Sequence, residues 1–546
     1  MSKNLEVLLS GKDFTRLEVL DDLFIVFSIN KIDKLKLKKL LLSDFDDDLK
    51  IIRKISLIFG EFSLIRISFH EGIPKKISAF RSITSSFELF YCLNDTLYIS
   101  NSFKNILSKK DISEREVSEN ALIDLFLYQR NFSQETYLKN VFRLGHGEYI
   151  SYMNKTDIIK KQQIEKLELD SVFNLSKESS VLLDNLLETI STQLNNNHNA
   201  INTLSGGVDS SLIQSYLDNN KSISIAYDSP EFKNEIEYAK NASKLINTEH
   251  EFINLKEKDY LTNLIEASII LGQPSPDLPN IIIANELSKT SNNHFITSIY
   301  ADSIFGLSQI KNLVKSNFNI GDLINKSVSD KYGYASMNFV IAQKDNLGYV
   351  EKIFGKEKID FQLEKRSTYI NNLLVNQKNT SITVYDHIEF GSLIGFYTNN
   401  LLSIFRQIGD HYNKSFSSPF LDQSILKTSL KIPLEERYYN TTFGTKPILK
   451  KILSNRVKSY DIYNPKLGGA LPRTRFCIDG PLKDYFKRFE FPDFIDNSMK
   501  KEISNPTWEN SWIVSYSIFY SIWVENVLKN NTLKLTKDTL VLKWKF

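Results

Sequence analysis

Apolar residues in the first 160 positions occur in short runs, several of which alternate with polar residues as β-strands do. The clearest candidate strands cover residues 23–29, 62–69, 87–92 and 96–100. The last two flank Asn94-Asp95, a pair typical of hairpin turns. Residues 119–128 instead place Leu122, Leu125 and Phe126 on one helical face. The pattern therefore predicts a β-rich α+β domain over residues 1–160.

A polar stretch rich in Lys, Glu and Gln at 161–178 is predicted to be a linker, and the pattern changes beyond it. The predicted order is helix 179–194, strand 200–204, helix from 212, strand 223–227, helix 234–246 and strand 250–254. This alternation predicts an α/β domain with a doubly wound parallel sheet, in which ligands bind at the carboxyl ends of the strands. Further helical patterns at 281–287, over most of 310–410 and at 512–527 predict a helical C-terminal part. The second domain is thus expected to span 179–546.

Composition narrows the class of protein. The 546 residues are too many for one core, and 42% hydrophobic and 24% charged residues are typical of soluble globular proteins. A net charge of only +3 offers no electrostatic argument for nucleic-acid or membrane binding. With only Cys92 and Cys477 present, we expect neither a disulfide framework nor a cysteine-rich zinc site. The first residues lack a signal-peptide pattern and no apolar run reaches ~18 residues, so a cytoplasmic protein is expected.

The loop between the strand at 200–204 and the next helix carries the strongest chemical signal. It contains two glycines, one acid and three serines: Ser205, Gly206, Gly207, Asp209, Ser210 and Ser211. The glycines let the backbone approach an anion, and the first N–H groups of the helix point at that anion. The hydroxyls add donors, and the acid is suited to a Mg2+ that bridges phosphates. An ordinary turn with a serine N-cap is the alternative, but this spacing after a strand favours a nucleotide phosphate site.

These residues resemble the pyrophosphate-binding loop of the ATP pyrophosphatase superfamily, whose members split ATP between its α and β phosphates. The fingerprint differs from a Walker loop, because no G-x-x-x-x-G-K-[ST] ending is present. The resemblance implies ATP and Mg2+ as cofactors. It also implies a backbone contact to adenine near Ala226, on the second strand of the sheet.

A second loop, residues 297–306, resembles the S-G-E-G-x-D-E-x-F-G motif of asparagine synthetases. Asp302 matches the acid of that motif, so the resemblance and the strand order together predict a Mg2+ site formed by Asp209 and Asp302. A solvated loop acid is the alternative for Asp302. The motif's two glycines are replaced, one of them by Tyr300, and its substrate-contacting residue is Ile299. We predict that Tyr300 takes over that contact.

Two lysines lie in motifs that match the same family. Residues 444–451 resemble K-x-x-L-R-x and contain Lys446, and residues 464–472 resemble R-p-K-x-G-f-x-x-P and contain Lys466. The resemblance implies that both stabilise negative charge that builds up during the reaction, as fixed ammonium groups do in a dry site. Solvated surface lysines are the alternative. Residues 418–422 match the P-F-L-D motif, but the family's preceding Glu and Arg are replaced by serines, Ser415 and Ser417.

The order of motifs in residues 59–147 resembles the Ntn-type glutaminase domain of asparagine synthetases. The matching segments are Phe59–Leu64, Leu89–Cys92, Leu97–Leu107 and Arg143–Gly147. In that family an N-terminal Cys attacks glutamine and its own α-amine acts as the base. Position 2 is Ser2, and the residues after it do not match the family's opening either. We therefore expect a degenerate domain that does not hydrolyse glutamine, with Cys92 as a core residue.

The resemblance implies an ATP-dependent amide synthetase that adenylylates a substrate carboxylate and releases AMP after attack by an amine. Without a glutaminase cysteine, as in β-lactam synthetases and lasso-peptide cyclases, the amine is free ammonia or belongs to a substrate. The expected role is amidation or cyclisation in specialised-metabolite or modified-peptide biosynthesis. The alternatives are an ammonia-dependent asparagine synthetase and a non-catalytic scaffold. The expected substrate is a small molecule or peptide with a carboxylate and an amine. The protein is also a candidate to form a homodimer or to bind a biosynthetic partner protein. Binding to nucleic acid or to a membrane is not expected.

Overall fold

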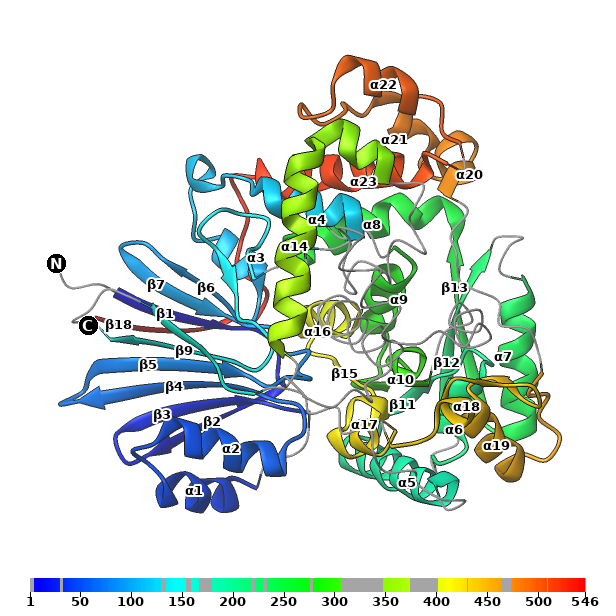
Figure 1. The fold of residues 1–546 in the computed structure, drawn as a ribbon, viewed down its shortest axis with the longest axis horizontal. Coiled ribbons are helices and arrows are strands. Elements are labelled where there is room, and N and C mark those ends of the chain that lie inside the picture. Colours follow the sequence, from blue (N-terminus) through cyan, green and yellow to red (C-terminus); the bar gives the residue numbers. More distant parts are fainter. Residues whose placement is uncertain are drawn as a thin grey trace.

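The structure is a computed structural model. It describes residues 4–29, 33–128, 131, 134–153, 159–165, 179–217, 221–228, 233–274, 278–305, 347–373, 401–429, 431–463, 473–507 and 509–545. Figure 1 shows two parts side by side: a pair of β-sheets that holds both ends of the chain, and a larger part in which helices surround a third sheet.

The first part contains a six-stranded antiparallel sheet. Its strands, in spatial order, are β10 (Ile159–Gln163), β9 (Glu148–Met153), β5 (Ile73–Arg81), β4 (Ser63–His70), β3 (Asp22–Phe27) and β2 (Phe14–Val19). In β3, Leu23, Ile25 and Phe27 face one core while Phe24 and Val26 face another, as the two-residue period of a strand requires. Helices α1 (Lys34–Ser43) and α2 (Asp48–Ile58) pack on the second of these faces (Figure 1). The predicted strands at 23–29 and 62–69 are confirmed as β3 and β4.

A five-stranded sheet lies against the first face. Its order is β18 (Leu540–Lys545), β1 (Asn4–Leu9), β7 (Thr96–Ser100), β6 (Phe90–Leu93) and β8 (Phe142–Arg143). The predicted hairpin is confirmed, since β6 and β7 are antiparallel partners, and so is the place of Cys92 in the core. Strand β18 pairs with β1 along its whole length, so the last strand of the chain belongs to the first part. The sequence-based division had placed residues 540–545 in the second domain.

The second part is built on a five-stranded parallel sheet. Its order is β13 (Glu249–Lys256), β12 (Lys221–Asp228), β11 (Ile201–Thr203), β14 (His294–Ile296) and β15 (Ser415–Ser417). The predicted alternation of strand and helix from 200 to 256 is confirmed. The chain runs outward from β11 to β13, then returns to place β14 on the other side of β11. Loops that follow β11 and β14 therefore emerge next to each other at the carboxyl ends of the strands, where ligands bind in sheets of this kind.

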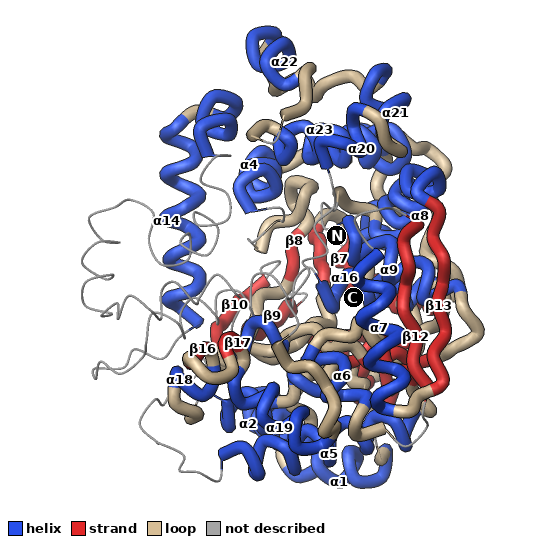
Figure 2. Tube along the Cα trace, turned by 90° about the vertical axis from the view of Figure 1, so that its right-hand side faces the viewer, coloured by secondary structure: helices blue, strands red, loops and turns tan. Residues whose placement is uncertain are grey.

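Helices cover both sides of this sheet. One group of helices that pack on one another consists of α8 (Tyr260–Leu271), α9 (Leu278–Lys289) and α16 (Leu402–His411). Another comprises α5 (Ser179–His198), α6 (Val208–Gln214), α7 (Lys233–Ile246) and α19 (Pro447–Arg456). Figure 1 shows α7 and α9 on opposite sides of β12, which both of them contact, and Figure 2 shows α7 in front of α9 when the molecule is viewed from the side of α7. The helical pattern predicted over most of 310–410 is confirmed for a short helix at 347–354, for α14 (Lys356–Leu373), which follows it, and for α16. Residues 306–346 and 374–400 lie outside the described residues.

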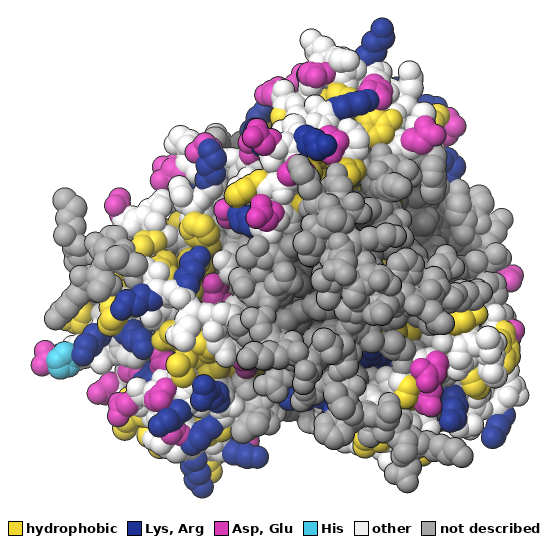
Figure 3. Space-filling model, in the orientation of Figure 1, with side chains coloured by type: hydrophobic (Ala, Val, Ile, Leu, Met, Phe, Trp, Pro, Cys, Tyr) yellow, Lys and Arg dark blue, Asp and Glu magenta, His cyan; other side chains and the backbone are white. Residues whose placement is uncertain are grey.

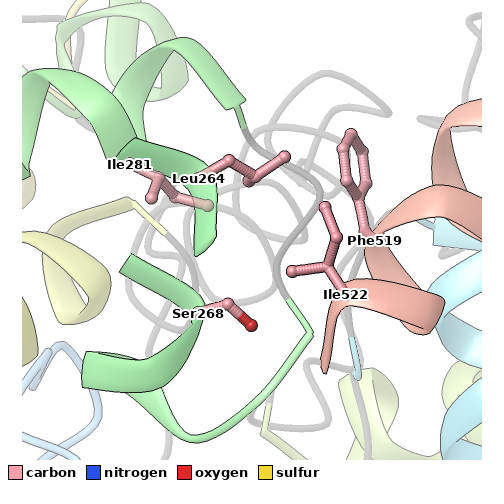
Figure 4. A pocket seen from close by; sticks show the side chains of 5 residues that line it. All are labelled: Leu264, Ser268, Ile281, Phe519 and Ile522. Carbon is pink, nitrogen blue, oxygen red and sulfur yellow. The ribbon is translucent and has the colours of Figure 1, made fainter. Parts of the chain in front are cut away.

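A second core joins the helices near the C-terminus to both parts. The predicted Trp-bearing helix is confirmed as α23 (Ser511–Trp523), which continues into a π-helical turn, η6 (Val524–Leu528). The fully buried indole N–H of Trp523 donates to the carbonyl of Gly272 at 2.8 Å and so ties α23 to the end of α8. A cavity of about 10 Å3 lies between α8, α9 and α23, and Figure 4 shows the side chains that line it. It offers one hydroxyl, Ser268, and at most the space of one water, so it is a packing gap rather than a ligand site.

Acidic and basic side chains are interspersed on the described part of the face that Figure 3 shows, in keeping with the small net charge. Within the described ranges, no helix combines the length and the apolar character needed to span a membrane.

Candidate active site

The glycine-rich loop after β11 has the predicted strand–turn–helix layout. The strand ends at Thr203 and α6 begins at Val208. Between them, Gly206 adopts a left-handed backbone with φ +76° and lies against the backbone of α7. The hydroxyls of Ser205 and Ser210 are 3.0 Å apart, and the Gly207 N–H donates to Ser205 Oγ at 3.3 Å. The loop is thus held by its own hydroxyls, with Ser205 and Gly207 exposed at the surface.

The two glycines are expected to differ sharply in their tolerance of alanine. A Cβ at Gly206 would lie 2.5 Å from the Ala239 nitrogen and closer still to the Tyr238 carbonyl, at a φ that L-residues rarely adopt. Gly206→Ala should therefore lower the free energy of unfolding by about 2 kcal/mol or more. Gly207→Ala, whose Cβ would meet only Ser205 Oγ at 3.4 Å, should change it by about 0.5 kcal/mol or less. Urea denaturation of both variants measures the difference, and equal losses would contradict this account of the loop.

The loop after β14 brings the second acid to the same edge of the sheet. The Thr297 N–H donates to the Ser417 carbonyl of β15 at 2.8 Å, which continues the strand pairing by one residue. Tyr300 then turns the chain with φ +83°, and Asp302 lies in the first turn of the short helix α10 (Ala301–Phe305). The Ser418 hydroxyl donates to the Ile299 carbonyl at 2.5 Å. These bonds hold the loop on its neighbouring strand while Asp302 points out of it.

Lys446 brings Asp209 and Asp302 together. Its ammonium nitrogen lies 2.5 Å from Asp209 Oδ2 and also contacts Asp302 Oδ1. The side chains are 7%, 16% and 23% exposed for Lys446, Asp209 and Asp302, so the three charges lie largely out of water. Burial alone would lower the pKa of Lys446, but the two carboxylates outweigh that effect and raise the pKa above its ordinary value. The lysine is therefore held as a cation at the carboxyl ends of β11 and β14.

The paired acids fit a Mg2+ ion. One ammonium nitrogen contacts both carboxylates, so a single cation can reach both. Within the described ranges, Asp209 Oδ1 is buried and has no hydrogen-bond partner, which leaves one carboxylate oxygen available to a metal. Those ranges hold no cluster of three or more Asp, Glu, His or Cys side chains arranged for a metal. Two carboxylates suffice for Mg2+, because this ion usually takes its other ligands from phosphates and water.

Tyr460 belongs to the site although no motif in the sequence pointed to it. Its hydroxyl donates to the Gly206 carbonyl and lies 3.0 Å from Ser211 Oγ. Burial, with the nearby charge of Asp209, raises the pKa of Tyr460 to about 12, so the phenol stays protonated. Tyr460 follows α19, the helix that Lys446 starts, so one segment contacts both the glycine loop and the acids. Only the packing of α19 on α6 reveals it.

The predicted adenine contact lies on β12, the strand that pairs with β11. Ala226 is buried near the carboxyl end of β12 and pairs with Asn254 of β13. Ser224, two residues earlier, donates its hydroxyl proton to the Leu204 carbonyl, which joins β12 to the start of the glycine loop. The structure therefore brings Ala226 to the same sheet edge as the predicted phosphate site.

Two further residues, Lys466 and Tyr300, were predicted to be catalytic. Lys466 lies outside the described residues. The Tyr300 side chain is fully buried, and Glu61, Ser86 and Arg406 are among the groups that act on its hydroxyl. The left-handed backbone turns this side chain into the contact between the two parts of the protein. The Tyr300 side chain therefore lies inside the protein, whereas the sequence had suggested a contact with the substrate.

A parallel α/β sheet with a glycine-rich loop, two acids and a lysine at the carboxyl ends of adjacent strands defines a nucleotide-binding class of enzyme domain. Residues 182–490 match the asparagine synthase family, and the chain belongs to that family. Members of this family are ATP-dependent ligases, and the domain indicates ATP-dependent amidation by adenylylation in general. No curated protein matches the chain.

Proposed function

We propose that this protein is an AMP-forming amide synthetase that acts in specialised-metabolite or modified-peptide biosynthesis. One observation carries the proposal: the Lys446 ammonium lies between Asp209 and Asp302, which follow adjacent parallel strands. A buried cation beside two acids suits a reaction in which negative charge builds up on phosphate oxygens and then leaves with pyrophosphate. The glycine loop next to Asp209 offers backbone N–H groups for phosphate.

The reaction takes place in two steps. A substrate carboxylate oxygen attacks the α-phosphorus of ATP, a P–O bond forms, and the bond from that phosphorus to the oxygen bridging the α and β phosphates breaks, releasing pyrophosphate. An amine nitrogen then attacks the acyl carbon, the C–O bond to AMP breaks, and the nitrogen gives up its proton to solvent. Both steps build negative charge on oxygen, and the largely buried Lys446 ammonium would stabilise that charge.

Asp209 and Asp302 would hold Mg2+, with Asp209 Oδ1 as the unsatisfied ligand atom. The ion would neutralise phosphate charge and orient the departing pyrophosphate. Ser205, Gly206, Gly207, Ser210 and Ser211 would contact phosphates, Ala226 would contact adenine through its backbone, and Lys466 is proposed as a second cation near the reacting atoms.

The fold assignment is part of the proposal. The strand order β13-β12-β11-β14-β15 supports a doubly wound ATP pyrophosphatase sheet. The two packed sheets of the first part support a degenerate Ntn-type domain. Arg81 of the first part is fully buried and donates to the carbonyls of Ser85 and Leu144, which suits a structural role. Ser2 lies outside the described residues.

The serines of β15 support a substrate other than free aspartate. Ser415 donates to Asp13 Oδ1 at 2.6 Å, and Ser417 Oγ lies 2.8 Å from His294 Nε2. Both serines are buried, so the two positions provide no exposed charge where the family motif has a Glu and an Arg. The absence of these two charges fits an acyl substrate that carries its own amine, as in β-lactam synthetases and lasso-peptide cyclases. We further propose that the protein is cytoplasmic and that it forms a homodimer or binds a biosynthetic partner protein.

A pyrophosphate-release screen tests the proposal. Carboxylate-bearing small molecules and peptides are offered with ATP and Mg2+, with and without ammonium, and AMP is measured by chromatography. We expect substrate-dependent pyrophosphate and AMP in equal amounts from the parent protein and none from Asp209→Asn. Asparagine formed from aspartate and ammonium would establish an asparagine synthetase instead. No pyrophosphate with any substrate, and no Mg-ATP binding by calorimetry, would establish the scaffold.

A further inference from the structure

The peptide between Gly206 and Gly207 in the glycine-rich loop can face two ways. The C=O and N–H of a trans peptide point to opposite sides, so the direction of the Gly206 carbonyl fixes the direction of the Gly207 N–H. Reversing this peptide would move the φ of Gly207 from −79° to about +100°, which glycine adopts readily and other residues rarely do. Because both residues are glycine, neither position has a Cβ that opposes the reversal.

Tyr460 stabilises one of the two orientations. Its hydroxyl donates to the Gly206 carbonyl, so the Gly207 N–H points away from the tyrosine and toward Ser205 Oγ, with 3.3 Å between nitrogen and oxygen. Ser205 and Gly207 are both exposed, so this N–H lies on the open side of the loop, where an anion can reach it. The reversed peptide would present a carbonyl oxygen there instead, and the partial negative charge of that oxygen would repel a phosphate.

The tyrosine hydroxyl is itself held in place. Its one proton goes to the Gly206 carbonyl, so the Ser211 hydroxyl, 3.0 Å away, donates to the tyrosine oxygen. Burial raises the pKa of Tyr460 to about 12, so the phenol keeps its proton at neutral pH. The hydroxyl is therefore a donor to the loop backbone under all ordinary conditions.

The segment that carries Tyr460 is attached to the helix that follows the loop. At the end of α19, Arg456 donates from Nε to Ser215 Oγ at 3.2 Å and from Nη2 to the Ser215 carbonyl at 3.3 Å, just after α6. At the start of α19, the Lys446 ammonium contacts Asp209 of α6. Because both ends of α19 are bound to α6 and its end, the tyrosine is kept beside the glycine-rich loop.

We infer that Tyr460 is a positioning residue that holds the Gly206–Gly207 peptide with its N–H directed toward the phosphates of ATP. The tyrosine acts through the backbone and does not itself touch the nucleotide. The inference rests on the proposed function, because it concerns the phosphate site of that function. It also gives the α19 segment two tasks, since Lys446 at its start contacts the acids and Tyr460 beyond its end orients the loop.

Tyr460→Phe tests the inference in the full-length chain, because it keeps the ring and removes only the hydroxyl. Molecules with the reversed peptide do not bind phosphate, and their share raises the apparent dissociation constant in proportion. We expect the dissociation constant of Mg-ATP, measured by calorimetry, to rise about 3- to 10-fold, the worth of one hydrogen bond. Tyr485→Phe is the matched control: that hydroxyl donates to Glu525 at 3.1 Å among the C-terminal helices, and its loss should leave Mg-ATP binding unchanged.

A second background separates positioning from direct contact or general packing. Gly207→Ala is compatible with the observed φ of −79° but opposes the positive φ of the reversed peptide, so it replaces the task of the tyrosine. Compared with Gly207→Ala alone, the double variant with Tyr460→Phe should therefore show no further loss of Mg-ATP affinity.

Three results would contradict the inference. An equal loss from Tyr460→Phe in both backgrounds would mean that the hydroxyl contacts the phosphates itself or only supports the fold. No loss in the parent background would mean that the loop keeps its orientation without the tyrosine. Either result overturns the inference while the proposed function stands. If the parent itself binds no Mg-ATP, both are overturned.

Discussion

Lys446→Met is expected to lower the turnover number about 100- to 1000-fold, with a much smaller change in the affinity for ATP. The reason is that a fixed cation in a dry site acts on the charge of the transition state, and removal of one such group costs turnover by this amount. Lys446 is 7% exposed and contacts two acids, so water cannot readily replace its charge. Steady-state kinetics with the substrate found in the pyrophosphate screen measure both quantities.

The same substitution should also reveal the metal site without any turnover. Without the ammonium, Asp209 and Asp302 repel each other, and the free energy of unfolding should fall by about 2 kcal/mol, less than for a wholly buried pair because both acids are partly exposed. Mg2+ at millimolar concentration should restore most of that loss in the variant and stabilise the parent less, because the Lys446 ammonium already neutralises the two acids there. Lys451→Met, an exposed position in the same helix, is the control. A variant whose stability ignores Mg2+ would show that the two acids do not form a metal site.

The fold was predictable from the sequence where neighbouring residues decide the structure. Runs such as Ile223–Tyr227 are apolar except at Ser224 because a parallel strand is covered on both faces, and helical spacing follows in 234–246. The pairing of β18 with β1 was not predictable in this way, since it joins opposite ends of the chain and local periodicity carries no information on partners. For the same reason the division of the chain missed the return of residues 540–545 to the first sheet.

The site was predictable as far as loop position determines it. Asp209 and Asp302 were expected together because acids after adjacent parallel strands meet at one edge, and Lys446 was expected with them because its motif resembles that of the family. The structure brings Lys446 into contact with both acids. Tyr300 was assigned to the substrate because its place in the motif was known but its φ was not, and a left-handed residue directs its side chain differently. Glu61 and Arg406 are 345 residues apart, and only folding makes them partners.

Asp209→Asn should be better tolerated by the fold than Lys446→Met, although both should abolish most of the activity. Removing one acid leaves Lys446 and Asp302 as a balanced pair, whereas removing the lysine leaves two acids facing each other. The double variant Lys446→Met with Asp209→Asn should therefore be more stable than Lys446→Met alone, with a coupling of about 1 to 2 kcal/mol between the two changes. Urea denaturation of the parent, both single variants and the double variant measures this coupling. Losses that simply add would mean that the three charges act independently, and the compact cation–acid arrangement on which the proposed reaction depends would have to be abandoned.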